Sequence, residues 1–213
     1  MLNLFLGFTA TPAAGWNQYV TPPTPRKGTK DPVKQQQQIA DKEQELQELA
    51  HTCPILAMLT SAAVLDASSA SLLELSSPYS DVPIGAMLGM LLRQKCHEAE
   101  RPICLYGFDI QKYMTIAAFE ALRHQVATIP SGVPTYTIPF EFWRETPLAD
   151  ERHLVDPYRL LMPTAYRGIL DLPAICRFLG IPCLSDEDLA TSPIGQARLA
   201  LELCKKTGIL SAS

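Results

Sequence analysis

In this 213-residue chain, the best candidates for a functional site are carboxylates, which can bind a metal ion. Asp109 ends the short apolar run "PICLYGFD" and precedes the amphipathic stretch "QKYMTIAAFEALRHQV". An aspartate at such a corner is either a ligand for a hard divalent cation or the N-cap of the next helix. The cluster Asp186, Glu187 and Asp188 has two similar interpretations, as a loop that supplies carboxylates or as the acidic first turn of a helix.

The other reactive side chains form no motif. The sequence contains no Cys-x-x-Cys pair, no histidine at zinc spacing and no Ser-His-Asp or Cys-His arrangement. The glycines of "IGAMLG" have the wrong spacing for a phosphate-binding loop. Reduced thiols, several of them buried, are therefore expected at Cys53, Cys96, Cys104, Cys176, Cys183 and Cys204.

Basic side chains suited to phosphate contacts gather around "RHLVDPYRLL". Arginine pairs with phosphate oxygens through two parallel hydrogen bonds. The alternative is a helix start, with Asp156 as the N-cap and Pro157 at the first helical position. The candidate contacts to nucleic acid in this region are Arg152, His153, Arg159 and Arg167.

An aromatic, proline-rich segment, "SGVPTYTIPFEFWRETPLADER", is a second candidate surface. Its rings either stack on bases or dock a protein partner, or they fold as a hairpin against the core. The side chains singled out for nucleic-acid binding are Tyr136 and Trp143.

The hydrophobic pattern of the sequence predicts the strands and helices that must position these residues. Two helices should end at the left-handed caps Gly180 and Gly208. Strands are predicted at 2–8, 55–63, 71–75 and 102–109, and helices at 31–51, from residue 84, at 111–126 and in three C-terminal segments. This order predicts one α/β domain over residues 1–213, a mixed sheet flanked by helices with a helical C-terminal third.

Residues 9–52 are expected to interrupt this domain as an insertion. The part from Thr9 to Thr29 is rich in proline, glycine and threonine, which predicts an exposed loop. A polar helix should follow, with Asp31 as its N-cap and Pro32 at its first position.

Composition narrows the class of protein. A net charge of −4 argues against a strongly electrostatic, sequence-blind nucleic-acid binder. The opening "MLNLFLGF" is too short and lacks the basic flank of a signal peptide, and no apolar run has the length of a membrane span. A soluble, cytoplasmic protein without a membrane partner is expected.

With these segments in order, the chain resembles the ribonuclease H-like three-prime to five-prime exonucleases, in particular the proofreading type related to family B DNA polymerases and its stand-alone phage and bacterial versions. "CLYGFDIQKYM" is similar to the strand-to-helix corner of that family, and places Asp109 at its metal-binding aspartate. "KDPVKQQQQIADKEQEL" is similar to an insertion helix of phage members. The resemblance implies a ribonuclease H-like sheet and a site for two Mg²⁺ or Mn²⁺ ions.

Most of the implied metal ligands are missing from this sequence. Gly7 and Thr9 stand where the family has the two acids of Asp-x-Glu-Thr. Setting Thr207 on the last threonine of the family puts Leu199 on a tyrosine and Leu203 on the fourth carboxylate. One carboxylate out of four cannot offset two divalent ions, so no metal is expected, and only Asp109 would remain as a ligand.

The resemblance therefore implies a catalytically inactive, exonuclease-like subunit that binds nucleic acid, a protein partner or both in DNA or RNA processing. An active Mg²⁺-dependent three-prime to five-prime exonuclease is the alternative, with Glu202 or the acidic cluster at 186–188 supplying a carboxylate. A purely structural subunit of an assembly is the third possibility, which the acidic isoelectric point of 5.6 favours.

Overall fold

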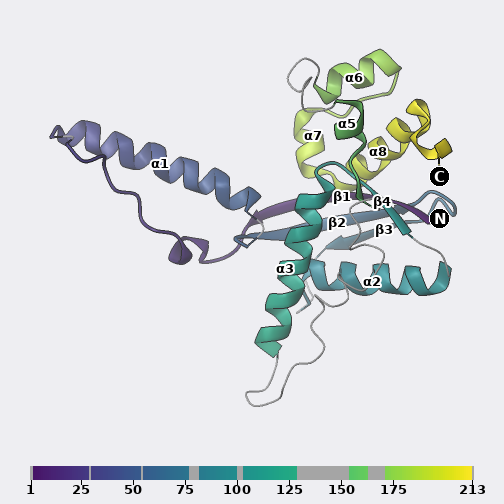
Figure 1. The fold of residues 1–213 in the computed structure, drawn as a ribbon, viewed down its shortest axis with the longest axis horizontal. Helices are drawn as coiled ribbons and strands as arrows, with labels where there is room; N and C mark the ends of the chain where they lie inside the picture. Colours follow the sequence, from purple (N-terminus) through teal and green to yellow (C-terminus); the bar gives the residue numbers. More distant parts are fainter. Residues whose placement is uncertain are drawn as a thin grey trace.

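A mixed five-stranded sheet forms the centre of the molecule (Figure 1). The computed structural model describes residues 2–28, 30–53, 55–76, 82–99, 103–128, 154–162 and 171–212. The strand order is β3-β2-β1-β4-β5, in which β1 is antiparallel to β2 and parallel to β4. The strands are β1 (Leu2–Pro12), β2 (Ala57–Asp66), β3 (Leu72–Ser76), β4 (Ile103–Tyr106) and β5 (Leu154–Val155).

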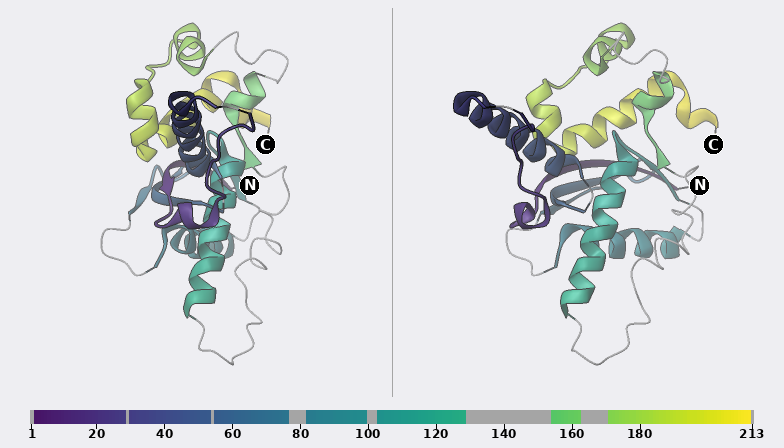
Figure 2. Two further views of the ribbon diagram at one scale, coloured as in Figure 1. Left: turned by 90° about the vertical axis from the view of Figure 1, so that its left-hand side faces the viewer. Right: turned by 60° about the vertical axis from the view of Figure 1, so that its left-hand side comes forward.

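Helices cover both faces of this sheet, as Figures 1 and 2 show. One face carries α2 (Ile84–Ala99) and α3 (Ile110–Thr128). The other carries α5 (Pro157–Leu161), α6 (Leu172–Leu179), α7 (Asp186–Thr191) and α8 (Pro193–Thr207), with α8 nearest the strands. Short 3₁₀ helices lie at Trp16–Tyr19 and Ile209–Ala212. The prediction of an α/β architecture with a mixed sheet is confirmed.

Alternation along β1 divides the core into two layers, because successive side chains of a strand point to opposite faces. Leu4, Leu6 and Phe8 pack with α2 and α3. Phe5 faces the other way, stacks on Tyr106 with ring centroids 4.8 Å apart, and packs against α8. A third apolar cluster, between α8, α5 and α6, extends the core away from the sheet.

Two buried polar side chains form hydrogen bonds with strand backbone groups at places where the neighbouring strand has ended. β1 continues past its pairing with β4, and Gln196 of α8 binds both backbone groups of Phe8 there (2.8 and 3.0 Å). β2 likewise extends past β3, and Glu120 of α3 accepts the Leu59 N–H at 2.6 Å and the Gly85 N–H at 2.8 Å. Buried backbone groups need such partners, since leaving them unpaired costs stability.

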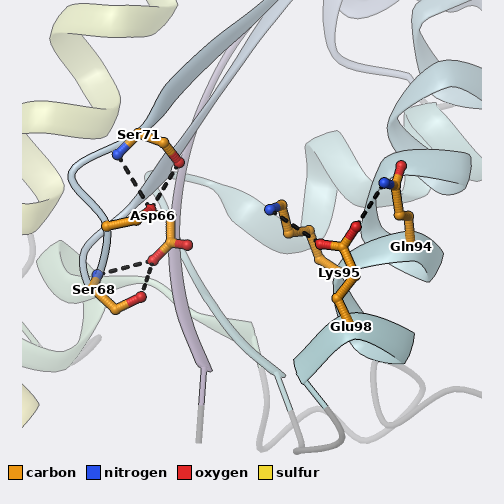
Figure 3. A network of polar contacts seen from close by, with 7 residues as sticks. Asp66, Ser68, Ser71, Gln94, Lys95 and Glu98 are labelled. Carbon is orange, nitrogen blue, oxygen red and sulfur yellow. Dashed lines mark hydrogen bonds and ion pairs between the residues drawn. The ribbon is translucent and has the colours of Figure 1, made fainter.

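The β2–β3 turn is closed by a carboxylate (Figure 3). Asp66 accepts hydrogen bonds from the Ser68 backbone at 2.8 Å and from its hydroxyl at 2.6 Å. Burial favours the protonated carboxyl, but the hydrogen bonds from Ser68 and Ser69 outweigh it, so the pKa of Asp66 is lowered. The turn therefore holds its two strands best when Asp66 is ionised.

The helix α1 (Pro32–Thr52) projects from the body as an arm (Figures 1 and 2). It begins as predicted, because Asp31 accepts the Val33 N–H at 3.0 Å and Pro32 occupies the first turn. The preceding chain runs back along the helix, where the Arg26 N–H donates to Gln38 at 3.1 Å. Near the other end of α1, Ala50 is fully buried.

The predicted insertion starts too early in the sequence. Residues 9–12 belong to β1, where Ala10, Thr11 and Pro12 pair with the first residues of β2 after a register shift between Thr9 and Ala10. The proline at the strand end is tolerated because it requires no ladder donor there. The excursion from the sheet therefore begins at Ala13 rather than at Thr9.

Among the described helices, none is both long enough and apolar enough to span a membrane.

Candidate functional site

Two aspartates meet at the carboxyl ends of the parallel strands β4 and β5. Asp109 follows β4, and Asp156 follows β5 directly. The Gly107 N–H donates to the Val155 carbonyl at 3.0 Å, which continues the pairing of the two strands to this edge. The backbone N–H of Asp109 then donates to Asp156 Oδ2 at 2.8 Å. Such strand ends are where open α/β sheets place their ligand sites.

Arg159 bridges the two carboxylates. Its Nη2 lies 2.5 Å from Asp109 Oδ1, and its Nε lies 3.3 Å from Asp156 Oδ2. The Arg159 backbone N–H also donates to Asp156 Oδ1 at 3.1 Å, which makes Asp156 the N-cap of α5 with Pro157 in the first turn. The interpretation of this segment as a capped helix start is confirmed, and Arg159 is held by acids of its own chain.

The two carboxylates sit in different environments. The Asp156 side chain is only 9% exposed, whereas that of Asp109 is 50% exposed. Burial raises the pKa of Asp156 although backbone hydrogen bonds from Arg159 and Asp109 oppose the shift. The hydrogen bond to Asp109 raises the pKa of the Arg159 guanidinium. The cluster therefore keeps its arginine charged.

The backbone of Asp109 is unusual for a residue with a side chain. Its φ angle is +47°, in the left-handed region, where aspartate and asparagine are tolerated better than most residues. Asp109 directly precedes α3, and its carbonyl accepts the Tyr113 N–H at 3.2 Å. Its carboxylate pairs with Arg159 instead of capping the helix, so the N-cap interpretation of this side chain is wrong.

Two cavities flank the Asp109–Arg159–Asp156 cluster. One of about 460 Å³ lies between the cluster and the start of α6, and one of about 410 Å³ lies on the side of α3 and β5. The first is lined by Phe108, Asp109, Asp156, Tyr158, Arg159, Asp171, Leu172, Pro173 and Leu189. One acid of this lining, Asp171, already has a structural role: it is the N-cap of α6 and accepts the Ala174 N–H at 2.7 Å.

Gly7 and Thr9 occupy the face of β1 that is turned to α8. Gly7 is buried, and a Cβ added there would collide with the Pro193 carbonyl oxygen and lie 2.9 Å from Cβ of Gln196. Thr9 Oγ1 is 2.6 Å from the Ser61 hydroxyl. The close approach of α8 therefore leaves no room for an acidic side chain at position 7.

Leu199 and Leu203 are core residues of α8. They are 4% and 0% exposed and pack in the third apolar cluster, against Met162, Ile175 and Cys176. A carboxylate at either position would lose its hydration without a paired charge, which is strongly unfavourable. The helix therefore presents hydrocarbon at both of the positions that the resemblance assigns to metal chemistry.

The acids considered as replacements lie elsewhere. Glu202 is 49% exposed and pairs with Lys205 at 3.0 Å on the outer side of α8. The acidic cluster forms the first turn of α7, which begins at Asp186 and has Ser185 as its N-cap. Asp188 accepts the Ser185 hydroxyl at 2.7 Å. The helix-start interpretation of this cluster is confirmed.

Several candidate contacts fall outside the part of the chain that the structure describes. This applies to the proposed phosphate contacts other than Arg159 and to both aromatic candidates. These residues are Arg152, His153, Arg167, Tyr136 and Trp143.

Sequence reasoning missed Gln196 and Glu120, the buried polar residues that bond the strand backbones. Glu120 is 2% exposed and Gln196 is 7% exposed. A signal was present for Glu120, which lies three residues after Ala117 and so on the same face of the amphipathic stretch 111–126. A lone polar residue on an apolar helix face has to find a partner, and this identifies such positions.

Within the described ranges, no group of three or more His, Cys, Asp or Glu side chains is placed to hold a metal ion. Asp109 and Asp156 are the pair best placed to bind a cation, and the Arg159 guanidinium already lies between them.

Comparison with known proteins adds no relative. No family model, curated protein or solved structure matches this chain.

Proposed function

We propose that this chain is a non-catalytic protein with a ribonuclease H-like exonuclease fold, which binds a partner in DNA or RNA processing without hydrolysing phosphodiester bonds. The observation that carries the proposal is the position of Arg159. Its guanidinium contacts both Asp109 and Asp156 at the strand ends. An internal cation thus pairs with Asp109, the one carboxylate that the resemblance assigns to a metal ion.

The sheet supports the fold named in this proposal. β1 lies in the centre, with the antiparallel pair β2–β3 on one side and the parallel strands β4 and β5 on the other. Helices cover both faces (Figure 1). This is the mixed, helix-flanked sheet that the sequence resemblance implies, and it brings Asp109 to the edge where ligands bind in open sheets.

The charge balance supports the loss of catalysis. Two-metal hydrolysis needs several carboxylates that converge on a pair of divalent ions. Here two carboxylates already share one guanidinium. The positions on β1 and α8 that the resemblance assigns to metal chemistry include Gly7, Leu199 and Leu203, which have no charge. A Mg²⁺ ion would have to displace Arg159 and would then find too few oxygen ligands.

A protein partner fits the described residues better than a nucleic acid does. The charge of Arg159 is neutralised by its two aspartates, so it is not free to bind phosphate. The whole chain also carries a net charge of −4. Low positive charge disfavours binding to the phosphate backbone and leaves a protein as the better-supported partner.

Hydrolysis of labelled oligonucleotides tests the loss of catalysis. Single-stranded DNA and RNA are incubated with the protein and Mg²⁺ or Mn²⁺, next to the Asp109→Asn variant. Asparagine tolerates the left-handed backbone of residue 109, so the variant should fold. Asp41→Asn on α1, which alters an exposed aspartate far along the arm, is the matched control. We expect no shortening of the oligonucleotide with any of the three proteins. Degradation that Asp109→Asn abolishes and Asp41→Asn preserves would establish an active exonuclease instead.

Fluorescence anisotropy with the same oligonucleotides decides between the two kinds of partner. Binding that weakens steeply as salt is raised would establish a nucleic-acid partner. We expect no salt-sensitive binding. In that case, co-purification of other chains from the source cells at fixed stoichiometry is the measurement that identifies a protein partner.

A further inference from the structure

The arm formed by α1 and the chain just before it carries opposite charges at its two ends. Residues 26–34, at the free tip, contain four basic side chains and one acidic side chain, which gives a net charge of +3. Residues 43–48, toward the body, contain three glutamates and no basic residue, which gives −3. The residues between these segments contribute one charge of each sign, so the arm as a whole is neutral.

The charged side chains at both ends of the arm are exposed and lack a countercharge in their own chain. Lys27, Lys34, Glu45 and Glu48 are all exposed. Among the residues that the structure describes, none of the four forms an ion pair. Glu48 accepts a hydrogen bond from the neutral Gln44 amide at 3.1 Å, which leaves its charge in place. These charges can therefore attract a partner outside the chain.

Two features of the arm hold these charges in position. The chain before α1 runs back along the helix (Figures 1 and 2), and the Arg26 N–H donates to Gln38 at 3.1 Å, so the basic segment lies against the helix. Lys34, Glu45 and Glu48 share one side of α1, because separations of 11 and 14 residues are close to three and four turns of 3.6 residues. This side presents a cation near the tip and two carboxylates nearer the body.

We propose that α1 is a self-association surface, on which the arm of a second copy of this chain packs in the antiparallel direction. A two-fold axis through the middle of the paired helices sets the basic end of each arm beside the acidic end of the other, so the same attraction occurs twice. A parallel pair would bring like charges together, which is unfavourable. Each arm projects from its body (Figure 1), so the two bodies lie at opposite ends of the pair.

The balance of charge favours a second copy over a nucleic acid. A phosphate backbone would be attracted to the basic tip but repelled by the three glutamates nearer the body. A copy of the arm offers charge of the matching sign and amount to both ends at once. The inference does not depend on the proposed function, because the arm contains no residue of the Asp109–Arg159–Asp156 cluster.

Analytical ultracentrifugation of the intact chain at several salt concentrations tests the proposal. We expect a dimer at low salt with a dissociation constant on the order of 10 µM, since two single helices form a small interface. Raising NaCl from about 0.02 M to about 0.5 M should weaken this dimer at least about tenfold, because dissolved ions screen exposed charges.

The sign of the salt effect distinguishes the arms from other contacts. The arm is neutral, so the rest of each copy carries the net charge of −4, and salt would strengthen a contact that does not rely on opposite charges. A dimer that salt does not weaken would therefore overturn the proposal. So would a chain that stays monomeric at low salt up to about 0.2 mM, well above the expected dissociation constant.

Charge reversal identifies the surface. One variant carries Lys27→Glu with Lys34→Glu, and the other carries Glu45→Lys with Glu48→Lys. Each variant alone should dimerise at least about tenfold more weakly than the native chain, because like charges then face each other. An equimolar mixture of the two should restore the dimer, since each end of one variant again meets the opposite sign on the other.

A matched control separates the arm from the net charge of the chain. Arg177→Glu with Arg198→Glu alters exposed residues of α6 and α8 and changes the net charge by as much as the double lysine variant does. This control should still dimerise. Loss of the dimer in the control, or a mixture that stays monomeric, would overturn the proposal. Oligonucleotide binding that the double lysine variant loses, without any dimer of the native chain, would assign the tip to nucleic acid instead. The salt series on the unsubstituted chain decides the question even if a variant fails to fold.

Discussion

Replacing Gln196 with methionine should remove a large part of the stability that joins α8 to the sheet. The substitution keeps the length of the side chain and its preference for helix, and deletes only the amide. The Gln196 amide binds the N–H and the carbonyl of Phe8 at 2.8 and 3.0 Å, and donates to the Leu189 carbonyl at 2.5 Å. All three backbone groups lose their partner in the variant.

The magnitude follows from the burial of the amide. Gln196 is 7% exposed, so water replaces its amide poorly. An unsatisfied buried backbone group costs about 1–3 kcal/mol, and better apolar packing of methionine offsets a part of this. We expect a loss of about 2–4 kcal/mol in the free energy of unfolding. For a chain of this size, that loss lowers the melting temperature by roughly 6–12 °C.

Urea unfolding followed by circular dichroism measures the loss, with the slope m checked for constancy. Glu202→Gln is the matched control, because it lies on the same helix, is 49% exposed, and gives up only one ion pair with Lys205. Such a pair contributes less than about 1 kcal/mol. A Gln196→Met variant that is no less stable than this control would refute the reasoning that the amide completes the free edge of β1.

Three further changes test other parts of the structure. Gly7→Ala should destabilise the fold by at least about 1–3 kcal/mol in urea unfolding, since the new Cβ meets the Pro193 carbonyl; unchanged stability would contradict the tight contact of β1 with α8. Gly180→Ala should cost about 1 kcal/mol in the same assay, because alanine is strained at φ +65°, and a neutral result would argue against the left-handed cap. Carbon-13 NMR titration should find the Asp156 carboxyl protonated at higher pH than that of Asp66, because the pKa of the first is raised and that of the second is lowered. The contribution of Asp66 to the free energy of unfolding should then be lost as the pH falls through the pKa of Asp66 in the folded state. The contribution of Asp156 should be lost as the pH rises through the pKa of Asp156 in the folded state. If Asp66 titrated at a higher pH than Asp156, both assignments would be contradicted.

Local signals in the sequence predicted the helix ends well. Asp31 with Pro32, and Asp156 with Pro157, start their helices as N-cap and first-turn proline. Gly180 also ends its helix in the left-handed conformation that was predicted for it. Each of these preferences arises within a few residues of chain, so no knowledge of the tertiary structure is needed.

Features that depend on distant partners could not be predicted in this way. Gln196 binds Phe8 across 188 positions, and Arg159 reaches Asp109 across 50. The capping interpretation of Asp109 failed for this reason, since a charged partner outside the helix took its carboxylate. The last four residues of β1 were likewise assigned to a loop, because their strand character comes from pairing with β2. Tertiary partners override local preference in both cases.

The projecting helix α1 has a single acidic side chain, the N-cap Asp31, to complement the positive end of its dipole. Its first turn contains no acidic residue and includes Lys34. The peptide dipoles make the N-terminal end positive, so the carboxylate of Asp31, which accepts the Val33 N–H, stabilises this end, whereas Lys34 opposes it. Dissolved ions screen both effects, which have opposite signs. Raising the ionic strength should therefore change the stability of this exposed arm little.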